Sequence, residues 1–203
     1  MLNEAILTYN LKFNKTDEIT LKECNKVEKV RGRLFSLGLI SSNSDGISFG
    51  NISLRYKKKN SFVMTSSKTG EYPKLTPSYY SLVKKIDFKN FTTYAVGPSK
   101  PSIDSISHGA IYELDSNINA VIYINNEKIW NYMLQNDYLL MTEDSYNSPQ
   151  MLKDIKKVYK DIDPFLNNIF AIKNDKGGVL AFGKTLSQAE KSIYEVLKNI
   201  LKS

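Results

Sequence analysis

The sequence predicts a single soluble domain that mixes strands and helices, of the α/β or α+β class. Apolar residues make up 41% of the 203 residues and aromatic residues 11%, and they recur along the whole chain, which excludes a disordered protein. Segments with strand-like alternation and segments with helical spacing follow one another without an internal repeat or a low-complexity linker. A chain of this length buries enough surface for one core without disulfides or a structural metal.

Residues 1–18 read as an irregular N-terminal lead-in, with a strand within residues 4–14 as an open alternative. The first helix is predicted over residues 19–39, and residues 19–203 are expected to form one domain. The helical spacing of three or four residues is carried by Cys24, Val27, Val30, Leu34 and Leu37. The polar stretch from Ser41 to Gly46 cannot continue this helix.

The rest of the chain alternates between short strands and helices. Alternating apolar residues predict a hairpin over residues 52–56 and 61–65. Further short strands are predicted over residues 92–97, 120–124, 169–173 and 179–182. Helices are predicted over residues 104–115, 127–135, 149–159 and 186–202. The last helix has the clearest signal, because Thr185 and Gln188 form a capping box in front of one apolar stripe.

Charge and targeting signals limit the classes of partner. The net charge is +7, but only Arg31, Arg33 and Arg55 among the 28 basic residues are arginines, and the lysines are spread along the chain. Base-specific contacts favour arginine, so we expect neither nucleic acid nor a membrane as the partner. The start of the chain lacks a secretory leader, and the single cysteine, Cys24, cannot form an internal disulfide. We therefore expect a cytoplasmic protein.

Three loops carry residue types that bind anions. They are a glycine-flanked turn that enters a strand (residues 46–55), a small polar loop that leaves the next strand (65–70), and a loop that opens a helix (100–104). Free main-chain amides, hydroxyls and an amide side chain are the donors that a phosphate group needs. Turn chemistry explains each loop taken alone, so none of them is a site by itself.

In their order along the chain these segments resemble the class II aldolase/adducin head family, over about residues 31–200. The matching motifs are Gly50-Asn51-Ile52-Ser53-Leu54-Arg55, Thr69-Gly70 with Lys74-Leu75-Thr76, Pro101-Ser102-Ile103-Asp104 with His108-Gly109-Ala110-Ile111-Tyr112, Ala120-Val121, and the closing segment from Gly178 to Leu186 with Ala189. The resemblance implies a three-layer α/β/α fold around a central mixed, largely antiparallel sheet. It also implies a homo-oligomer, commonly a tetramer.

The family's chemistry depends on a divalent ion, usually zinc, held by three histidines, and this chain departs from that pattern. The positions of the three ligands hold Tyr123, Asn125 and Gly177, and His108 is the only histidine in the chain. A three-histidine site therefore cannot form within one subunit. We expect no cofactor, and a divalent metal such as zinc only if the chain is an active enzyme. Tyr123 and Asn125 are expected to fill the former metal cavity, bonded to each other or to water.

The resemblance leaves part of an anion site. Asp104 stands where the family has a catalytic glutamate, and Ile103 replaces a serine that contacts phosphate. The remaining residues compatible with an anion are Asn51, Thr69, Gly70 and Ser102. Asp104 and His108 are four residues apart on one predicted helix, so they could form an acid–base pair or a purely structural contact. Oxygen ligands such as Asp104, Asn125 and Asp175 leave a hard-cation site open, without fixing its geometry.

Two classes of function follow from these residues. In the first, the protein is a metal-free, catalytically degenerate relative of the aldolases. It then binds a small anionic or sugar-phosphate-like ligand, or it serves as an oligomeric scaffold like the adducin head. In the second, it is an active lyase or isomerase on a small hydroxy or keto substrate, with Asp104 as acid/base.

Overall fold

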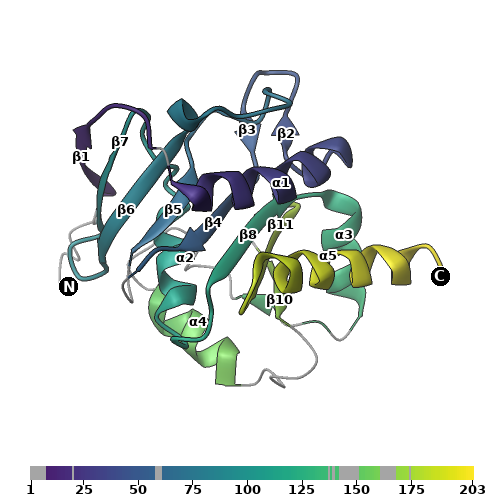
Figure 1. Cartoon of the computed structure of the whole chain (residues 1–203). Coiled ribbons are helices and arrows are strands. Elements are labelled where there is room, and N and C mark those ends of the chain that lie inside the picture. The colour runs from purple at the N-terminus through teal and green to yellow at the C-terminus, as the bar shows by residue number, and fades with distance from the viewer. Residues whose placement is uncertain are drawn as a thin grey trace.

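The structure is a computed structural model, and it describes residues 8–19, 21–57, 61–136, 138, 140–141, 151–160, 168–173 and 175–203. Within these ranges the chain forms one nine-stranded sheet with helices on both faces, and a separate two-stranded hairpin (Figure 1). The predicted α/β class and mixed sheet are therefore confirmed.

The strand order in the sheet is β1-β7-β6-β5-β4-β8-β11-β10-β9. Neighbours are antiparallel except for the parallel pairs β1–β7 and β9–β10 at the two edges. The strands of this sheet are β1 (Asn10–Lys15), β4 (Asn51–Arg55), β5 (Phe62–Thr65), β6 (Tyr80–Asp87), β7 (Thr92–Gly97), β8 (Ala120–Asn125), β9 (Leu140–Met141), β10 (Ile169–Ile172) and β11 (Gly178–Gly183). The hairpin consists of β2 (Ser41–Ser42) and β3 (Ser48–Phe49).

Helices cover the two faces of the sheet and create two cores. One face carries α1 (Lys22–Ser36), α3 (Glu127–Gln135) and α5 (Leu186–Ile200), and the other carries α2 (Ser105–Tyr112) and α4 (Met151–Lys160) (Figure 1). A single 3₁₀ turn, η1 (Pro77–Tyr79), precedes β6. Side chains of the central strand β8 alternate between the two cores. Ile122 packs in the core under α1, α3 and α5, and Val121 packs in the core under α2 and α4. This is the three-layer arrangement that the resemblance implied.

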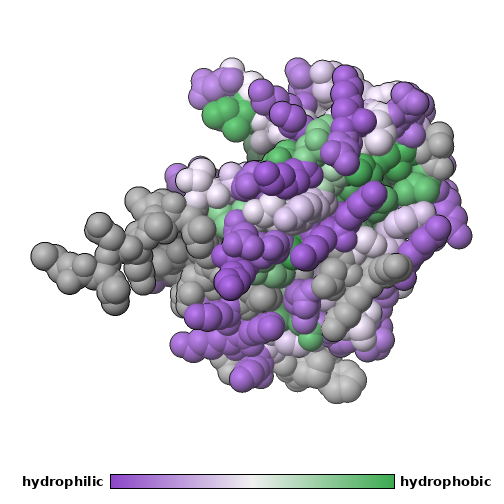
Figure 2. Space-filling view, turned by 90° about the vertical axis from the view of Figure 1, so that its left-hand side faces the viewer, coloured by the Kyte–Doolittle hydropathy of each residue, from purple (hydrophilic) through white to green (hydrophobic). Residues whose placement is uncertain are grey.

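Strands β2, β3, β6 and β9 were not predicted, and a strand at the position of β1 was only an alternative within residues 4–14. β6 was not predicted, because a bulge between Val83 and Lys85 breaks its alternation of buried and exposed residues. Part of the lead-in forms the edge strand β1, which half-buries Leu11 and Phe13 against the sheet. Exposed polar residues on this edge, including Lys12, hinder pairing with a second sheet. In Figure 2, hydrophilic residues dominate the coloured part of the surface on this side of the molecule.

The helix predicted over residues 127–135 is confirmed with these bounds as α3, whereas other helices are shorter than predicted. The first helix spans Lys22–Ser36 instead of residues 19–39, and the helix predicted over 104–115 begins at Ser105 and ends at Tyr112. Among the described residues, the structure contains no helix that is both long and apolar enough for a transmembrane span.

Candidate functional site

One end of the sheet gathers most of the residues singled out by the sequence. Strand register pairs Asn51, at the start of β4, with Tyr123 on β8, and it pairs Asn125, at the end of β8, with Gly178. Residues that are far apart in the sequence therefore lie side by side on three adjacent strands. The loop in front of β11 brings Gly177 to the same end.

Two loops join the strands at this end. Ser66, which follows β5, forms an isolated β-bridge with Pro101, and the Ser67 amide donates to the Lys100 carbonyl at 2.9 Å. The polar loop of residues 66–70 therefore lies against the loop that opens α2. Asp104 is the residue immediately before this helix, so its carboxyl group lies where the strands and the two loops meet.

Asp104 is the point on which two of the predicted anion ligands converge. The Asn51 Nδ2 amide donates to Asp104 Oδ2 at 2.6 Å, and the Ser102 hydroxyl donates to the same oxygen at 2.9 Å. Asn51 is buried, and among the described residues its Oδ1 atom has no hydrogen-bond partner. The carboxylate of Asp104 thus accepts the hydrogen bonds that an external anion would otherwise receive from Asn51 and Ser102.

Thr69 and Gly70 lie in the adjoining loop, with partners of their own. The Thr69 hydroxyl donates to the Ser66 carbonyl at 2.9 Å, and the Gly70 amide donates to Ser48 Oγ on β3 at 3.1 Å. A Cβ atom on Gly70 would lie 1.9 Å from the Ser41 carbonyl oxygen, so only glycine allows this close approach. The structure therefore brings Asn51 and Ser102 together, and it holds Gly70 against the β2–β3 hairpin.

His108 lies in the core and not in the site. Its Nδ1 atom lies 2.7 Å from Ser53 Oγ, which in turn lies 2.8 Å from the Tyr112 hydroxyl. His108 Nε2 is buried without a hydrogen-bond partner in the described part of the chain, so the hydrogen bond to Asp104 that helical spacing allowed is not formed. Burial lowers the pKa of His108 to about 4, against the opposing effect of the Asp104 charge. His108 is therefore a neutral core residue at pH 7.

Tyr123, at the first metal-ligand position of the family, bonds to a carboxylate. Its hydroxyl donates to Asp175 Oδ2 at 2.5 Å. Burial and the Asp175 charge raise the pKa of Tyr123, so the phenol keeps its proton. The pKa of Asp175 is raised by burial, and the charge of Asp104 raises it further, while the hydrogen bond from Tyr123 lowers it. Tyr123, Asp104 and Asp175 therefore form one electrostatically coupled cluster.

The other two ligand positions are shaped around each other. The Asn125 side chain donates from Nδ2 to the Lys176 carbonyl at 3.2 Å. Gly177 has a φ of +90°, and a Cβ atom placed on it would lie 2.5 Å from Asn125 Oδ1. The Asn125 side chain thus occupies space that a side chain at position 177 would need.

The residues present do not match the family's metal. At the three positions where the family resemblance implies imidazole ligands, this chain has a phenol that donates to Asp175, an amide that donates to a carbonyl, and a glycine. The described residues contain no cluster of three or more histidine, cysteine, aspartate or glutamate side chains that could hold a metal ion. The oxygen-ligand alternative built on Asp104, Asn125 and Asp175, which includes an amide ligand, stays a prediction.

The crowding between Gly177 and Asn125 can be measured. We expect Gly177→Ala to lower the free energy of unfolding by about 1–3 kcal/mol, because alanine is strained at this φ and its methyl group meets Asn125. Gly38→Ala is the matched control, since Gly38 has a φ of +68° but no heavy atom within 4 Å of the added Cβ. Urea denaturation should show a larger loss in the free energy of unfolding for Gly177→Ala than for Gly38→Ala. Adding Asn125→Ala to Gly177→Ala should remove this difference. Equal losses at Gly177 and Gly38 would refute the packing of Asn125 against Gly177.

Two serines that bond residues singled out by the sequence were not themselves assigned a role. Ser53 bonds His108, and Ser48 bonds the Gly70 amide. Both belong to the glycine-flanked segment 46–55 that the sequence singled out. Their hydroxyls were hidden among turn residues, because the partners lie 55 and 22 residues away along the chain.

Comparison with known proteins identifies the family and shows similar folds. The family described as "Class II Aldolase and Adducin N-terminal domain" matches residues 37–200. No curated protein sequence matches the chain. The fold is similar to that of an L-fuculose 1-phosphate aldolase, with a TM-score of 0.67 and 16% identity over 91% of this chain and 85% of that one. It is also similar to YgbL from Escherichia coli, described as an aldolase/epimerase/decarboxylase, with a TM-score of 0.66 and 16% identity over 88% and 86%. The match to the N-terminal class II aldolase domain of a protein from Thermoplasma acidophilum covers 100% of this chain and 98% of that one, with a TM-score of 0.58 and 11% identity.

Proposed function

Because the chain belongs to the class II aldolase and adducin N-terminal domain family, we propose that it binds a small anionic or sugar-phosphate-like ligand beside Asp104 without the family's zinc chemistry. The ligand class is supported by the names of structural relatives, which include an L-fuculose 1-phosphate aldolase and a sugar-phosphate aldolase from Thermotoga maritima. The loss of zinc chemistry is supported by Tyr123, Asn125 and Gly177, which replace the three histidines.

The observation that carries the proposal is the pair of hydrogen bonds on one oxygen of Asp104. Asn51 Nδ2 and Ser102 Oγ both point at Asp104 Oδ2, so two donors are already oriented toward a negative charge. Donors fixed in this way bind an anion without a further cost for ordering them. The carboxylate of Asp104 competes with the ligand for these donors, and its charge repels an anion. We therefore expect the native protein to bind phosphate weakly.

Removal of that competing charge gives the first test. Asp104→Asn should tighten the binding of inorganic phosphate by about tenfold, or about 1.4 kcal/mol, because it removes the repulsion from the site. Titration followed by the thermal midpoint and by NMR amide shifts of Thr69, Gly70 and Ser102 would measure the affinity. All titrations should contain a chelator, so that metal ions do not contribute.

Asp17→Asn is the control for net charge, since Asp17 is exposed and lies in the segment after β1. An equal gain in phosphate affinity in Asp17→Asn and Asp104→Asn would show that the effect comes from the overall charge of the protein. Ile103→Ser restores the hydroxyl found in the family, and the Ile103 side chain is exposed, so this variant should fold normally. If phosphate fails to bind to the native chain, to Asp104→Asn and to Ile103→Ser, the anion proposal is wrong.

Metal analysis tests the second half of the proposal. The purified protein should contain less than stoichiometric zinc, and added zinc should not raise its thermal midpoint. Stoichiometric zinc that is lost in Asn125→Ala or Asp104→Ala would overturn the metal-free assignment.

A lyase or isomerase with Asp104 as acid/base is the second candidate function. It is favoured by the position of Asp104, a partly exposed residue whose carboxylate is held in place by Asn51 and Ser102. The test is exchange of a carbon-bound proton of dihydroxyacetone phosphate in D₂O, with a chelator present. Exchange that disappears in Asp104→Asn, while phosphate still binds, would establish this candidate.

A scaffold role is the remaining possibility, and we expect a cytoplasmic homo-oligomer, a tetramer by analogy with the family. Sedimentation velocity on the full chain would give the oligomeric state directly. A stable oligomer without phosphate binding or proton exchange would favour a scaffold.

A further inference from the structure

A groove of about 540 Å³ lies at the opposite end of the sheet from Asp104. Its floor includes Leu54 and Arg55 at the end of β4, and Asn119 in front of β8. One wall is the face of α1 that carries Lys26 and Lys29. The other wall is the segment from Lys184 to Ser187, where β11 passes into α5. Since strands rise about 3.3 Å per residue, roughly 15–20 Å separate this groove from Asp104.

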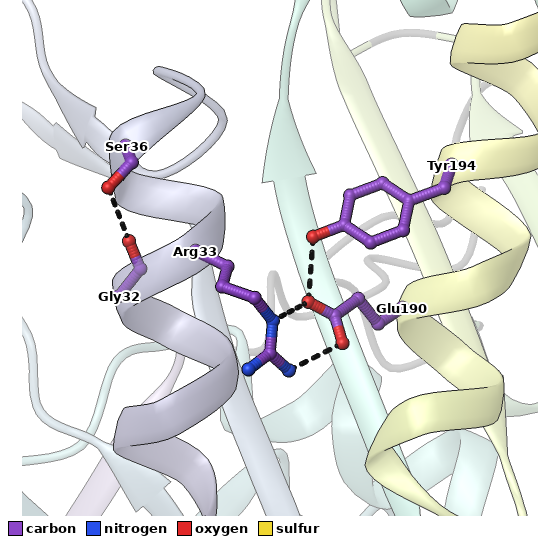
Figure 3. Close-up of polar contacts among 5 residues, drawn as sticks. All are labelled: Gly32, Arg33, Ser36, Glu190 and Tyr194. Atoms are coloured by element: carbon purple, nitrogen blue, oxygen red, sulfur yellow. Dashed lines mark hydrogen bonds and ion pairs between the residues drawn. The ribbon is translucent and has the colours of Figure 1, made fainter.

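The α1 wall is fixed by an ion pair that offsets the charge of Arg33. Arg33 Nε and Nη2 donate to the two carboxylate oxygens of Glu190 on α5, each at 2.7 Å (Figure 3). The Tyr194 hydroxyl donates to the same carboxylate at 2.8 Å. This arrangement ties α1 to α5 beside the groove.

The lysines of the groove, in contrast, carry charges that no paired carboxylate among the described residues offsets. In the described part of the chain, the ammonium groups of Lys26, Lys29 and Lys184 form no ion pair. The Arg55 side chain turns to the other face of the sheet, where its guanidinium lies over the Tyr112 ring of α2 and donates to the carbonyls of Ile118, Tyr112 and Asp115. The three lysines therefore share the groove with a single lining carboxylate, that of Glu23.

The start of α5 adds main-chain donors to this excess of positive charge. Thr185 Oγ1 accepts from the Gln188 amide at 3.1 Å, and Gln188 Oε1 accepts from the Lys184 amide at 2.9 Å, so the first turn is rigidly capped. Leu186 and Ser187, in the first turn of α5, line the groove, and their main-chain amides have no intrahelical acceptor. No acidic side chain lies in the first turn of α5, so the positive end of the helix dipole is not neutralised there.

We propose that this groove is a second binding site, for a phosphorylated small molecule. Its phosphate group would lie at the start of α5, between the amides of Leu186 and Ser187 and the ammonium groups of Lys184 and Lys29. The volume lies within the usual range for small-molecule sites, and Val30, Leu54 and Leu186 provide apolar contact for an organic part. This site is independent of the function proposed for Asp104.

The experiment is an NMR titration of the full chain with inorganic pyrophosphate at fixed ionic strength. We expect saturable shifts of the Lys184, Leu186 and Ser187 amides, and at least a tenfold loss of affinity in the double variant Lys29→Gln/Lys184→Gln. The matched control is Lys198→Gln/Lys202→Gln, which removes the same charge from exposed lysines at the far end of α5. Thermal midpoints would establish that both double variants are folded.

The outcomes separate this proposal from its alternatives and from the first site. The absence of saturable shifts in the native protein, or equal losses in both double variants, would overturn it. A short single-stranded oligonucleotide that displaces pyrophosphate at much lower concentration would replace it with a nucleic-acid surface. Asp104→Asn should leave the pyrophosphate shifts at Ser187 unchanged, so failure at one site is distinguishable from failure at the other.

Discussion

Arg31→Met is expected to lower the free energy of unfolding by about 3–5 kcal/mol. Arg31 is fully buried, and its Nη2 atom donates to the carbonyls of Thr69 at 2.8 Å and Tyr72 at 2.6 Å. Methionine has a similar length but no donor, so these carbonyls would lose a charged partner inside the protein. Arg31 is a main link between α1 and the loop that carries Thr69 and Gly70, so the position of this loop should change as well.

Urea denaturation and calorimetry would measure the effect, which corresponds to a fall in the thermal midpoint of roughly 6–20 °C for a domain of this size. Arg33→Met on the same helix is the control. The Arg33 side chain is 53% exposed, so water replaces its contacts in part, and we expect a loss of about 1–2 kcal/mol. An Arg31→Met variant no less stable than Arg33→Met would show that the buried guanidinium does not anchor the loop.

Arg31 illustrates why the sequence predicts the elements of this fold better than their contacts. The capping box at Thr185 and Gln188 is local, and the helix it predicts is confirmed as α5. Arg31 entered the sequence analysis only as a charge, because its partners lie 38 to 42 residues further along the chain. Burial of an arginine depends on that distant loop, and no local pattern reports it.

The candidate site shows the same limit. The family motifs singled out Asn51, Ser102 and Asp104, and the structure brings these three residues together. The motifs did not show that the carboxylate would accept both hydrogen bonds, or that Ser53 would bond His108. Both outcomes depend on side-chain orientations fixed by packing between α2 and the sheet. The space that Gly177 leaves for the Asn125 side chain likewise depends on how two separate chain segments pack, so neither segment predicts it alone.

The second large effect is a loss of stability in acid that is caused by His108. Burial lowers the pKa of His108 to about 4, below its ordinary value of 6.5. Between these values the unfolded chain binds a proton that the folded protein does not, so the free energy of unfolding falls as the pH falls. The shift corresponds to about 3 kcal/mol in total, with a slope of at most about 1.4 kcal/mol per pH unit.

His108→Gln isolates this contribution, because glutamine can still bond Ser53 but does not titrate. Urea denaturation at pH 7 and pH 4.5 should show a smaller loss of stability in the variant than in the native chain. Burial raises the pKa of Asp175, which acts in the opposite direction, but Asp175 is present in both proteins and its effect cancels in the comparison. Because His108 is the only histidine, its imidazole NMR signals can be followed without ambiguity. Titration of the folded protein's imidazole near pH 6.5, with parallel stability curves for both proteins, would show that His108 is accessible to protons and would contradict its burial in the core.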